Sequence, residues 1–116
     1  MHAMLPSSSL DLQKARESPY MFVDTGVPLL FRMAYTLEAE KLRMIIRLAG
    51  DANLLSGDDY FSIGQRNFLA AREVLMRNGV HIMAEQVGGN VSRTVRLDIS
   101  TGELLIRSPG QEDSVL

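Results

Sequence analysis

The sequence predicts a single α/β domain with a mixed sheet, two main helices and a C-terminal β-hairpin. Its 116 residues are enough for one domain and too few for two. The stretch from Phe61 to Arg107 has, in order, the patterns of a helix, a strand, a glycine turn and a hairpin. A second strand-like run precedes that helix, and the order strand, helix, strand is typical of a right-handed parallel crossover.

The composition excludes several classes of protein. With 46% hydrophobic and 22% charged residues, the chain is ordinary for a folded protein. A net charge of −2 gives no overall attraction to nucleic acid or to an anionic membrane. No apolar run approaches the roughly 20 residues of a membrane-spanning helix, and the first residues lack the pattern of a signal peptide. We therefore expect a cytoplasmic protein without a nucleic-acid partner and without membrane insertion.

Residues 1–22 are predicted to form a mobile loop. Pro6 and the three serines after it would stop any strand that begins at the N-terminus. Pro19 disfavours a helix that continues across it.

A first helix is predicted over residues 25–37. Asp24 and Thr25 can cap it, and Pro28 lies near its first turn, where a missing N–H does least harm. Its apolar residues recur at spacings of three and four. The branched apolar run over residues 42–49 is then interpreted as a buried strand, although a short helix could show the same run.

A second helix is predicted over residues 65–77, because it has an apolar face and ends at Asn78-Gly79, where glycine readily adopts a left-handed conformation. Residues 80–85 form the next predicted strand, parallel to the first. Residues 94–107 alternate between apolar and charged around a Ser-Thr-Gly turn, which predicts a hairpin. The domain would thus span residues 1–107, with residues 108–116 as a frayed tail.

The residue types available restrict the chemistry. There is no cysteine, so these 116 residues provide no disulfide, thiolate zinc site or cysteine nucleophile. The histidines are His2 and His81, too few for a multi-histidine metal site, and we expect neither a metal nor another cofactor. His81 lies in a predicted strand, where a structural or solvent-facing role is the expectation.

The remaining polar patterns have plain interpretations. Asp58-Asp59 is expected to be a solvated turn, and Gly88-Gly89 lacks the residues of the known phosphate-binding motifs. Three arginines near the hairpin are expected to lie on a solvated strand face: Arg93, Arg96 and Arg107.

Several segments resemble the chemoreceptor glutamine deamidase family, CheD, in residues, order and spacing. The resemblance is strong over residues 61–107 and loose over residues 7–60. It also includes His2-Ala3-Met4-Leu5-Pro6, which resembles the family's His-x-Met-Leu-Pro segment. The other matching segments are Ile63-Gly64-Gln65-Arg66-Asn67, Ala84-Glu85-Gln86-Val87-Gly88-Gly89-Asn90 with Arg93, Thr101-Gly102-Glu103-Leu104-Leu105, Tyr20 with Asp24, and Ala49-Gly50-Asp51-Ala52, in which Asp51 replaces a glycine.

The resemblance implies a fold and an activity. The fold is a layered α/β sandwich, and the activity is that of a protein-glutamine glutaminase, which hydrolyses glutamine side chains of chemoreceptors to glutamate and ammonia. The family uses a cysteine, a histidine and a threonine, and His2 matches the histidine. An imidazole can generate the attacking thiolate and protonate the departing ammonia.

The family's threonine and cysteine lie upstream of its histidine and cannot be carried over to this sequence. The chain is then a fragment, a catalytically silent relative, or a chain completed by a second polypeptide. We expect a fragment whose N-terminal strands are missing, because losing those strands would leave sheet edges unpaired. The isolated chain is therefore predicted to be marginally stable or self-associating.

The resemblance also implies partners. The cytoplasmic helices of chemoreceptors would be the substrate. The alternative function is a silent module that binds chemotaxis partners such as a CheC-type phosphatase, for which the apolar pair Leu54-Leu55 is the candidate contact.

Overall fold

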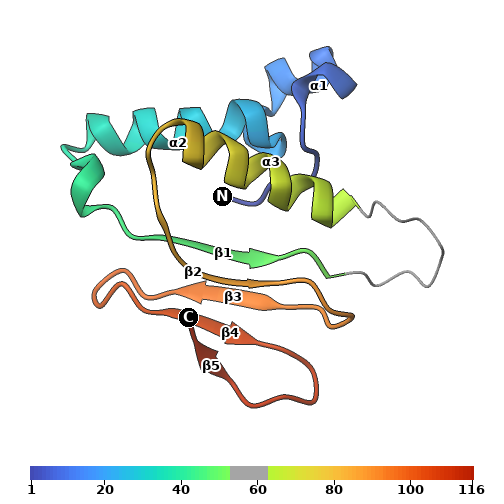
Figure 1. Cartoon of the computed structure of the whole chain (residues 1–116), viewed down its shortest axis with the longest axis vertical. Coiled ribbons are helices and arrows are strands. Elements are labelled where there is room, and N and C mark those ends of the chain that lie inside the picture. The colour runs from blue at the N-terminus through green and yellow to red at the C-terminus, as the bar shows by residue number, and fades with distance from the viewer. Residues whose placement is uncertain (53–62) are drawn as a thin grey trace.

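The computed structural model describes residues 1–52 and 63–116 (Figure 1). Its main helices are α2 (Val23–Thr36) and α3 (Ile63–Arg77). Strand β1 (Ile46–Gly50) pairs in parallel with β2 (Ile82–Val87), which confirms the predicted crossover. The hairpin is confirmed as β3 (Thr94–Leu97) and β4 (Leu104–Arg107), and β5 (Ser114–Val115) adds to it.

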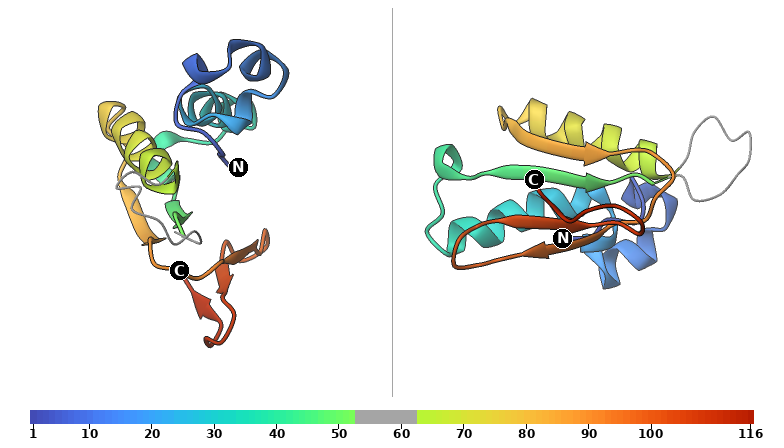
Figure 2. Two further views of the ribbon diagram at one scale, coloured as in Figure 1. Left: turned by 90° about the vertical axis from the view of Figure 1, so that its right-hand side faces the viewer. Right: turned by 90° about the horizontal axis from the view of Figure 1, so that it is seen from below.

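The α/β class is confirmed, with one difference in the sheet. We predicted one mixed sheet, whereas the described strands form a two-stranded parallel sheet, β1–β2, and a separate antiparallel sheet, β3–β4–β5. Both α2 and α3 lie on one side of the β1–β2 pair, and the hairpin lies on the other (Figures 1 and 2). The glycine turn after β2 leads the chain away from the parallel pair, so the hairpin starts a sheet of its own.

The first 22 residues are ordered, which contradicts the predicted mobile loop. They hold the short helix α1 (Leu12–Glu17), in which the Asp11 carboxylate caps the first turn by accepting from Lys14 N at 2.8 Å. Three-residue 3₁₀ turns flank it, η1 (Ser8–Leu10) and η2 (Pro19–Met21). Pro19 does end the helix region, as predicted, but it starts η2 rather than a loop.

The segment expected to fray at the C-terminus carries β5. Arg107 and Asp113 form an ion pair, with Nη2 and Oδ2 2.8 Å apart, that closes the turn between β4 and β5. Leu116 N then donates to Leu104 O at 2.9 Å, and Ser108 is 6% exposed. These contacts hold a polar tail whose sequence has no strand pattern.

The buried apolar side chains of the described residues are few and lie in several places: Ala15, Phe22, Val23, Leu75, Val80 and Ile106. Phe22 and Val23 are 0% and 1% exposed where η2 meets α2, and Ile106 is 1% exposed in the hairpin. Many large apolar side chains stay exposed, such as Leu42 at 97% and Ile99 at 93%. The described residues therefore leave much apolar surface uncovered.

The turn between β3 and β4 depends on an ionised carboxylate. The Ser100 hydroxyl donates to Asp98 Oδ1 at 2.6 Å, and the backbone N–H groups of Thr101 and Ser100 also donate to it. These hydrogen bonds hold the pKa of Asp98 below its usual 3.8, and the bond from the Ser100 hydroxyl has the largest effect.

We expect this turn to loosen only in acid. Because the pKa of Asp98 is lowered in the folded chain, its stabilising effect is complete above pH 3.8 and is lost as the pH falls through the folded value. Carbon NMR of the Asp98 carboxyl should give a titration midpoint below 3.8, and the Ser100 amide signal should shift with it. The Asp98→Asn variant should show no such shift at Ser100; a midpoint at or above 3.8 would contradict the assignment.

Candidate functional site

An open, mostly apolar groove of about 790 Å³ lies between the helices, β1 and the hairpin. It is lined from five parts of the chain: Met1, His2, Ala3 and Met4 from the N-terminal segment, Val23, Val27, Leu30 and Phe31 from α2, residues 45–52 around β1, Ile63, Gly64, Asn67, Phe68, Ala71 and Leu75 from α3, and Val87, Leu97 and Leu104 from β2 and the hairpin. A cavity of this size with few polar groups is typical of a binding site.

The polar groups of the groove are few and come from different elements. His2 comes from the N-terminal segment, Arg47 and Asp51 from β1 and the residues after it, and Asn67 from α3. Arg47 Nη1 donates to Gly102 O at 2.6 Å, which links β1 to the hairpin turn. The buried Oδ1 of Asn67 has no hydrogen-bond partner among residues 1–52 and 63–116, so it is available to accept from a donor group in the groove.

The His2 imidazole is exposed at the groove. The N-terminal segment reaches this place because it runs along the start of α2. Met4 N and Leu5 N both donate to Met21 O, at 2.8 and 3.0 Å, and Val23 N donates to Leu5 O at 2.9 Å. A bridge between Leu5 and Phe22 results, and it sets the direction from which His2 enters the groove.

His81 is exposed just before β2 and does not line the groove. The solvent-facing interpretation of His81 therefore holds. Over residues 1–52 and 63–116, no three histidine, aspartate or glutamate side chains gather as a metal ion would require. Leu54-Leu55 and Asp58-Asp59 lie outside the described residues.

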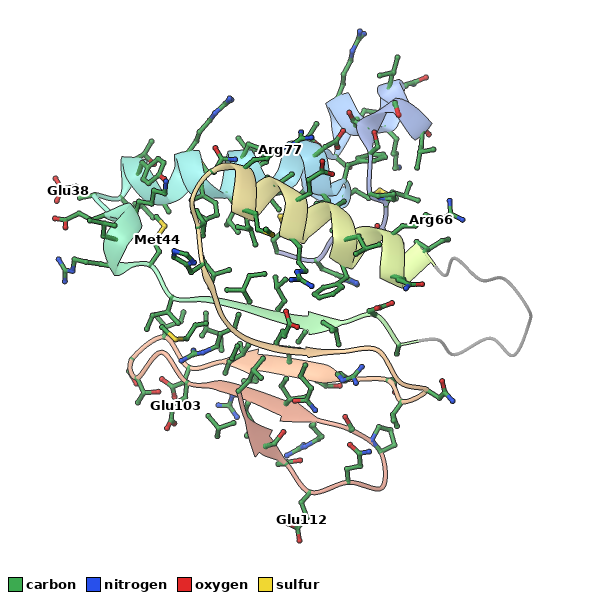
Figure 3. All side chains as sticks on the ribbon, viewed as in Figure 1. Glu38, Met44, Arg66, Arg77, Glu103 and Glu112 are labelled. Atoms are coloured by element: carbon green, nitrogen blue, oxygen red, sulfur yellow. The ribbon has the colours of Figure 1, made fainter. Side chains whose placement is uncertain are left out.

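The acidic side chains that are labelled in Figure 3 lie outside the groove. Glu38, Glu103 and Glu112 point outward from the edges of the molecule. Arg66 and Arg77 mark the two ends of α3, and Arg77 pairs with Glu73 at 2.5 Å on an exposed face. Among the described residues, the charged side chains that line the groove are Arg47 and Asp51.

Sequence reasoning missed the role of Arg93. We expected a solvated strand face, but its guanidinium is partly buried and donates to Gly50 O at 3.1 Å and to Gly88 O at 2.7 Å. Gly88 N also donates to Gly50 O, at 3.1 Å. These bonds join the carboxyl ends of β1 and β2 at one end of the groove. The signal was the Gly-Gly-Asn motif followed by an arginine, which the resemblance had already identified.

The groove can supply one part of an acyl-transfer site. An exposed imidazole beside an apolar surface can accept a proton from a nucleophile and donate it to a leaving group. No thiol accompanies it, since the 116 residues contain no cysteine. Among the residues the structure describes, no helix is long and apolar enough to cross a bilayer.

The uncovered groove predicts self-association. Its apolar lining and the edge of β1 to which no described strand pairs can both be buried against a second copy. We expect sedimentation velocity to show a mean mass that rises with protein concentration, and an apolar dye to bind the chain. A monomer that melts sharply at a temperature independent of concentration would contradict this expectation.

Comparison with known proteins agrees with the resemblance. The family model described as "CheD chemotactic sensory transduction" matches residues 4–108. A probable chemoreceptor glutamine deamidase CheD 1 of Syntrophus aciditrophicus is 48% identical over 110 residues, which are 95% of this chain and 69% of the relative. A probable chemoreceptor glutamine deamidase CheD of Solibacter usitatus is 40% identical over 116 residues, which are all of this chain and 69% of the relative. The match to the second relative spans the whole chain, position 2 included.

Proposed function

The chain belongs to the CheD family, and on this premise we propose that it is the histidine-bearing part of a deamidase that hydrolyses glutamine side chains of chemoreceptors. The observation that carries the proposal is the position of His2. The histidine that matches the family's catalytic residue lies at the apolar groove between the helices, β1 and the hairpin. Part of its lining, from Ile63 to Leu104, lies in residues 61–107, the stretch that resembles the family most.

His2 would act twice in the reaction. As a base it takes the proton of a thiol, and the thiolate attacks the carbon of the glutamine amide. As the acid it gives that proton to the nitrogen, so that the C–N bond breaks and ammonia leaves a thioester. Water, activated by the same imidazole, then hydrolyses the thioester to glutamate and restores the thiol. The 116 residues supply the imidazole, and the thiol must come from other polypeptide.

The apolar lining of the open groove would support this chemistry once the polypeptide that carries the thiol covers it. Exclusion of water from the reacting groups strengthens the electrostatic interactions among them. It also leaves surface on which the polypeptide that carries the thiol can pack. The place of action would be the cytoplasm, and the substrate would be the cytoplasmic helices of chemoreceptors.

A fusion protein tests the proposal. It joins these 116 residues to the upstream, cysteine-bearing segment of a family member, and it is incubated with a chemoreceptor cytoplasmic fragment. We expect the fusion protein to release ammonia, and we expect none from the 116 residues alone, because they hold no thiol. A folded fusion protein that releases no ammonia would contradict the proposal.

The absence of cysteine also favours a second candidate function. The chain would then be a silent module that binds chemotaxis partners such as a CheC-type phosphatase through Leu54-Leu55. Support for that contact comes from the sequence alone. Titration calorimetry with such a phosphatase tests it: binding that is lost on changing both leucines to serine, while the fusion protein stays inactive, would favour the silent module.

A further inference from the structure

The carboxylate of Asp24 joins the first turn of α2 to the segment that carries His2. Ser8 N donates to its Oδ1 at 2.8 Å and to its Oδ2 at 2.9 Å. The Ser8 hydroxyl donates to Oδ2 at 2.8 Å, and the Ser7 hydroxyl donates to the same oxygen at 3.2 Å. A single partly buried carboxylate thus accepts from three donor groups that lie 16 and 17 residues away along the chain.

Asp24 does not make these bonds as an ordinary helix cap. The cap position of α2 is Phe22, which makes no side-chain capping bond. Asp24 lies in the first turn, where a negative charge is favoured by the helix dipole, and its carboxylate is turned to the serine loop. On the backbone, Asp24 N donates to Pro6 O at 3.3 Å, so side chain and main chain bind the same segment.

The His2 segment is held to α2 on both sides of the histidine. On one side, Met1 lies against Gly26: a Cβ placed there would be 2.6 Å from Met1 Cε and 3.0 Å from Met1 Sδ. On the other side, the bonds of Leu5 to Met21 and Val23 are followed by those of Ser7 and Ser8 to Asp24. The start of α2 is a well-packed place for such an anchor, because Val23 is 1% exposed.

We infer that Asp24 is a positioning residue, which fixes the serine loop to α2 and through it holds His2 at the groove. The inference rests on the proposed function of His2. Asp24 does not line the groove, so it acts through the backbone of residues 4–8 rather than on substrate. Without the carboxylate, that backbone regains conformational freedom, and the imidazole no longer keeps one place.

Nitrogen relaxation NMR of the 116-residue chain tests the inference without any chemistry. The amides of Ala3 and Ser8 should be rigid, with order parameters near 0.85, and should fall below about 0.6 in Asp24→Ala. Asp24→Asn keeps one acceptor oxygen for Ser8 N and should give a smaller fall. Asp11→Asn is the matched control, because the Asp11 carboxylate accepts from Lys14 N within α1 and makes no hydrogen bond to the His2 segment, and it should leave Ala3 and Ser8 rigid.

The result at Ala3 separates positioning from plain stabilisation. If Ser8 loosens while Ala3 stays rigid, Asp24 only holds the loop, and the inference is overturned. Should Asp24→Ala fail to fold, Asp24→Asn decides in the same way. In an active fusion protein, Asp24→Asn should lower kcat and leave KM unchanged. The relaxation measurement needs no activity. An inactive fusion protein would therefore count against the proposed function, and the order parameters of Ala3 and Ser8 would still decide the role of Asp24.

Discussion

Replacing His2 with alanine in the fusion protein should lower kcat about 10²–10⁴-fold, the range for loss of a general acid–base group. The imidazole has to deprotonate the thiol and protonate the leaving nitrogen. Near neutral pH, no other polar side chain named at the groove can readily do both: the Arg47 guanidinium, the Asp51 carboxylate or the Asn67 amide. The measurement is the initial rate of ammonia release from a saturating receptor fragment.

His81 provides the matched control for this variant. It is also an exposed histidine, and it does not line the groove. His81→Ala should therefore keep the activity of the fusion protein. Equal losses in the two variants, or full activity in His2→Ala, would remove His2 from the chemistry.

Replacing Phe22 with alanine should destabilise the chain by about 3–5 kcal/mol, as is typical of a large aromatic side chain removed from a core. Phe22 is 0% exposed and lies at the junction of η2, α2 and the bridge to Leu5. Its loss would leave a cavity where the His2 segment is attached. The free energy of unfolding, measured by urea titration at low protein concentration, gives the comparison with the parent chain.

Leu42→Ala is the control for the core substitution. Leu42 is 97% exposed, so its truncation should change the free energy of unfolding by no more than about 0.5 kcal/mol. A chain that is only marginally stable would be unfolded by Phe22→Ala, and far-ultraviolet circular dichroism would then show the loss of helix directly. A Phe22→Ala variant as stable as Leu42→Ala would show that this cluster is not the core.

The elements with strong periodicity were predictable from the sequence. Helix α3 has a clear apolar face and a glycine stop, and the hairpin alternates around a glycine turn, so both were predicted within a few residues of their bounds. The order of β1, α3 and β2 then gave the parallel pairing. Each of these signals is local, or follows from a rule of connection, and needs no knowledge of tertiary contacts.

The elements that were missed depend on contacts between distant residues. Helix α1 has six residues, too few for a periodicity, and relies on the Asp11 cap. Strand β5 has two residues and depends on the pairing of Arg107 with Asp113. Arg93 and Asp24 were interpreted as a surface charge and a helix cap. The motif around Arg93 pointed to the family but not to its bonds with Gly50 and Gly88, and no pattern showed that Asp24 binds Ser7 and Ser8.

Of the candidate site, the sequence predicted one residue, His2, and not the groove around it. The resemblance identified His2, and the structure places it at a groove whose lining comes from residues 1–104. Only the fold brings those residues together. The same holds for the serine run, which gave no signal as a sequence and is the part of the N-terminal segment that Asp24 binds.

The most direct test of the account is to follow individual glutamines of a chemoreceptor fragment by peptide mass spectrometry. The fusion protein should convert particular glutamines to glutamate, and the conversion should require both the supplied thiol and His2. Conversion by the 116 residues alone, or by a fusion protein whose cysteine is changed to alanine, would contradict the account, because the reaction would then need no thiol.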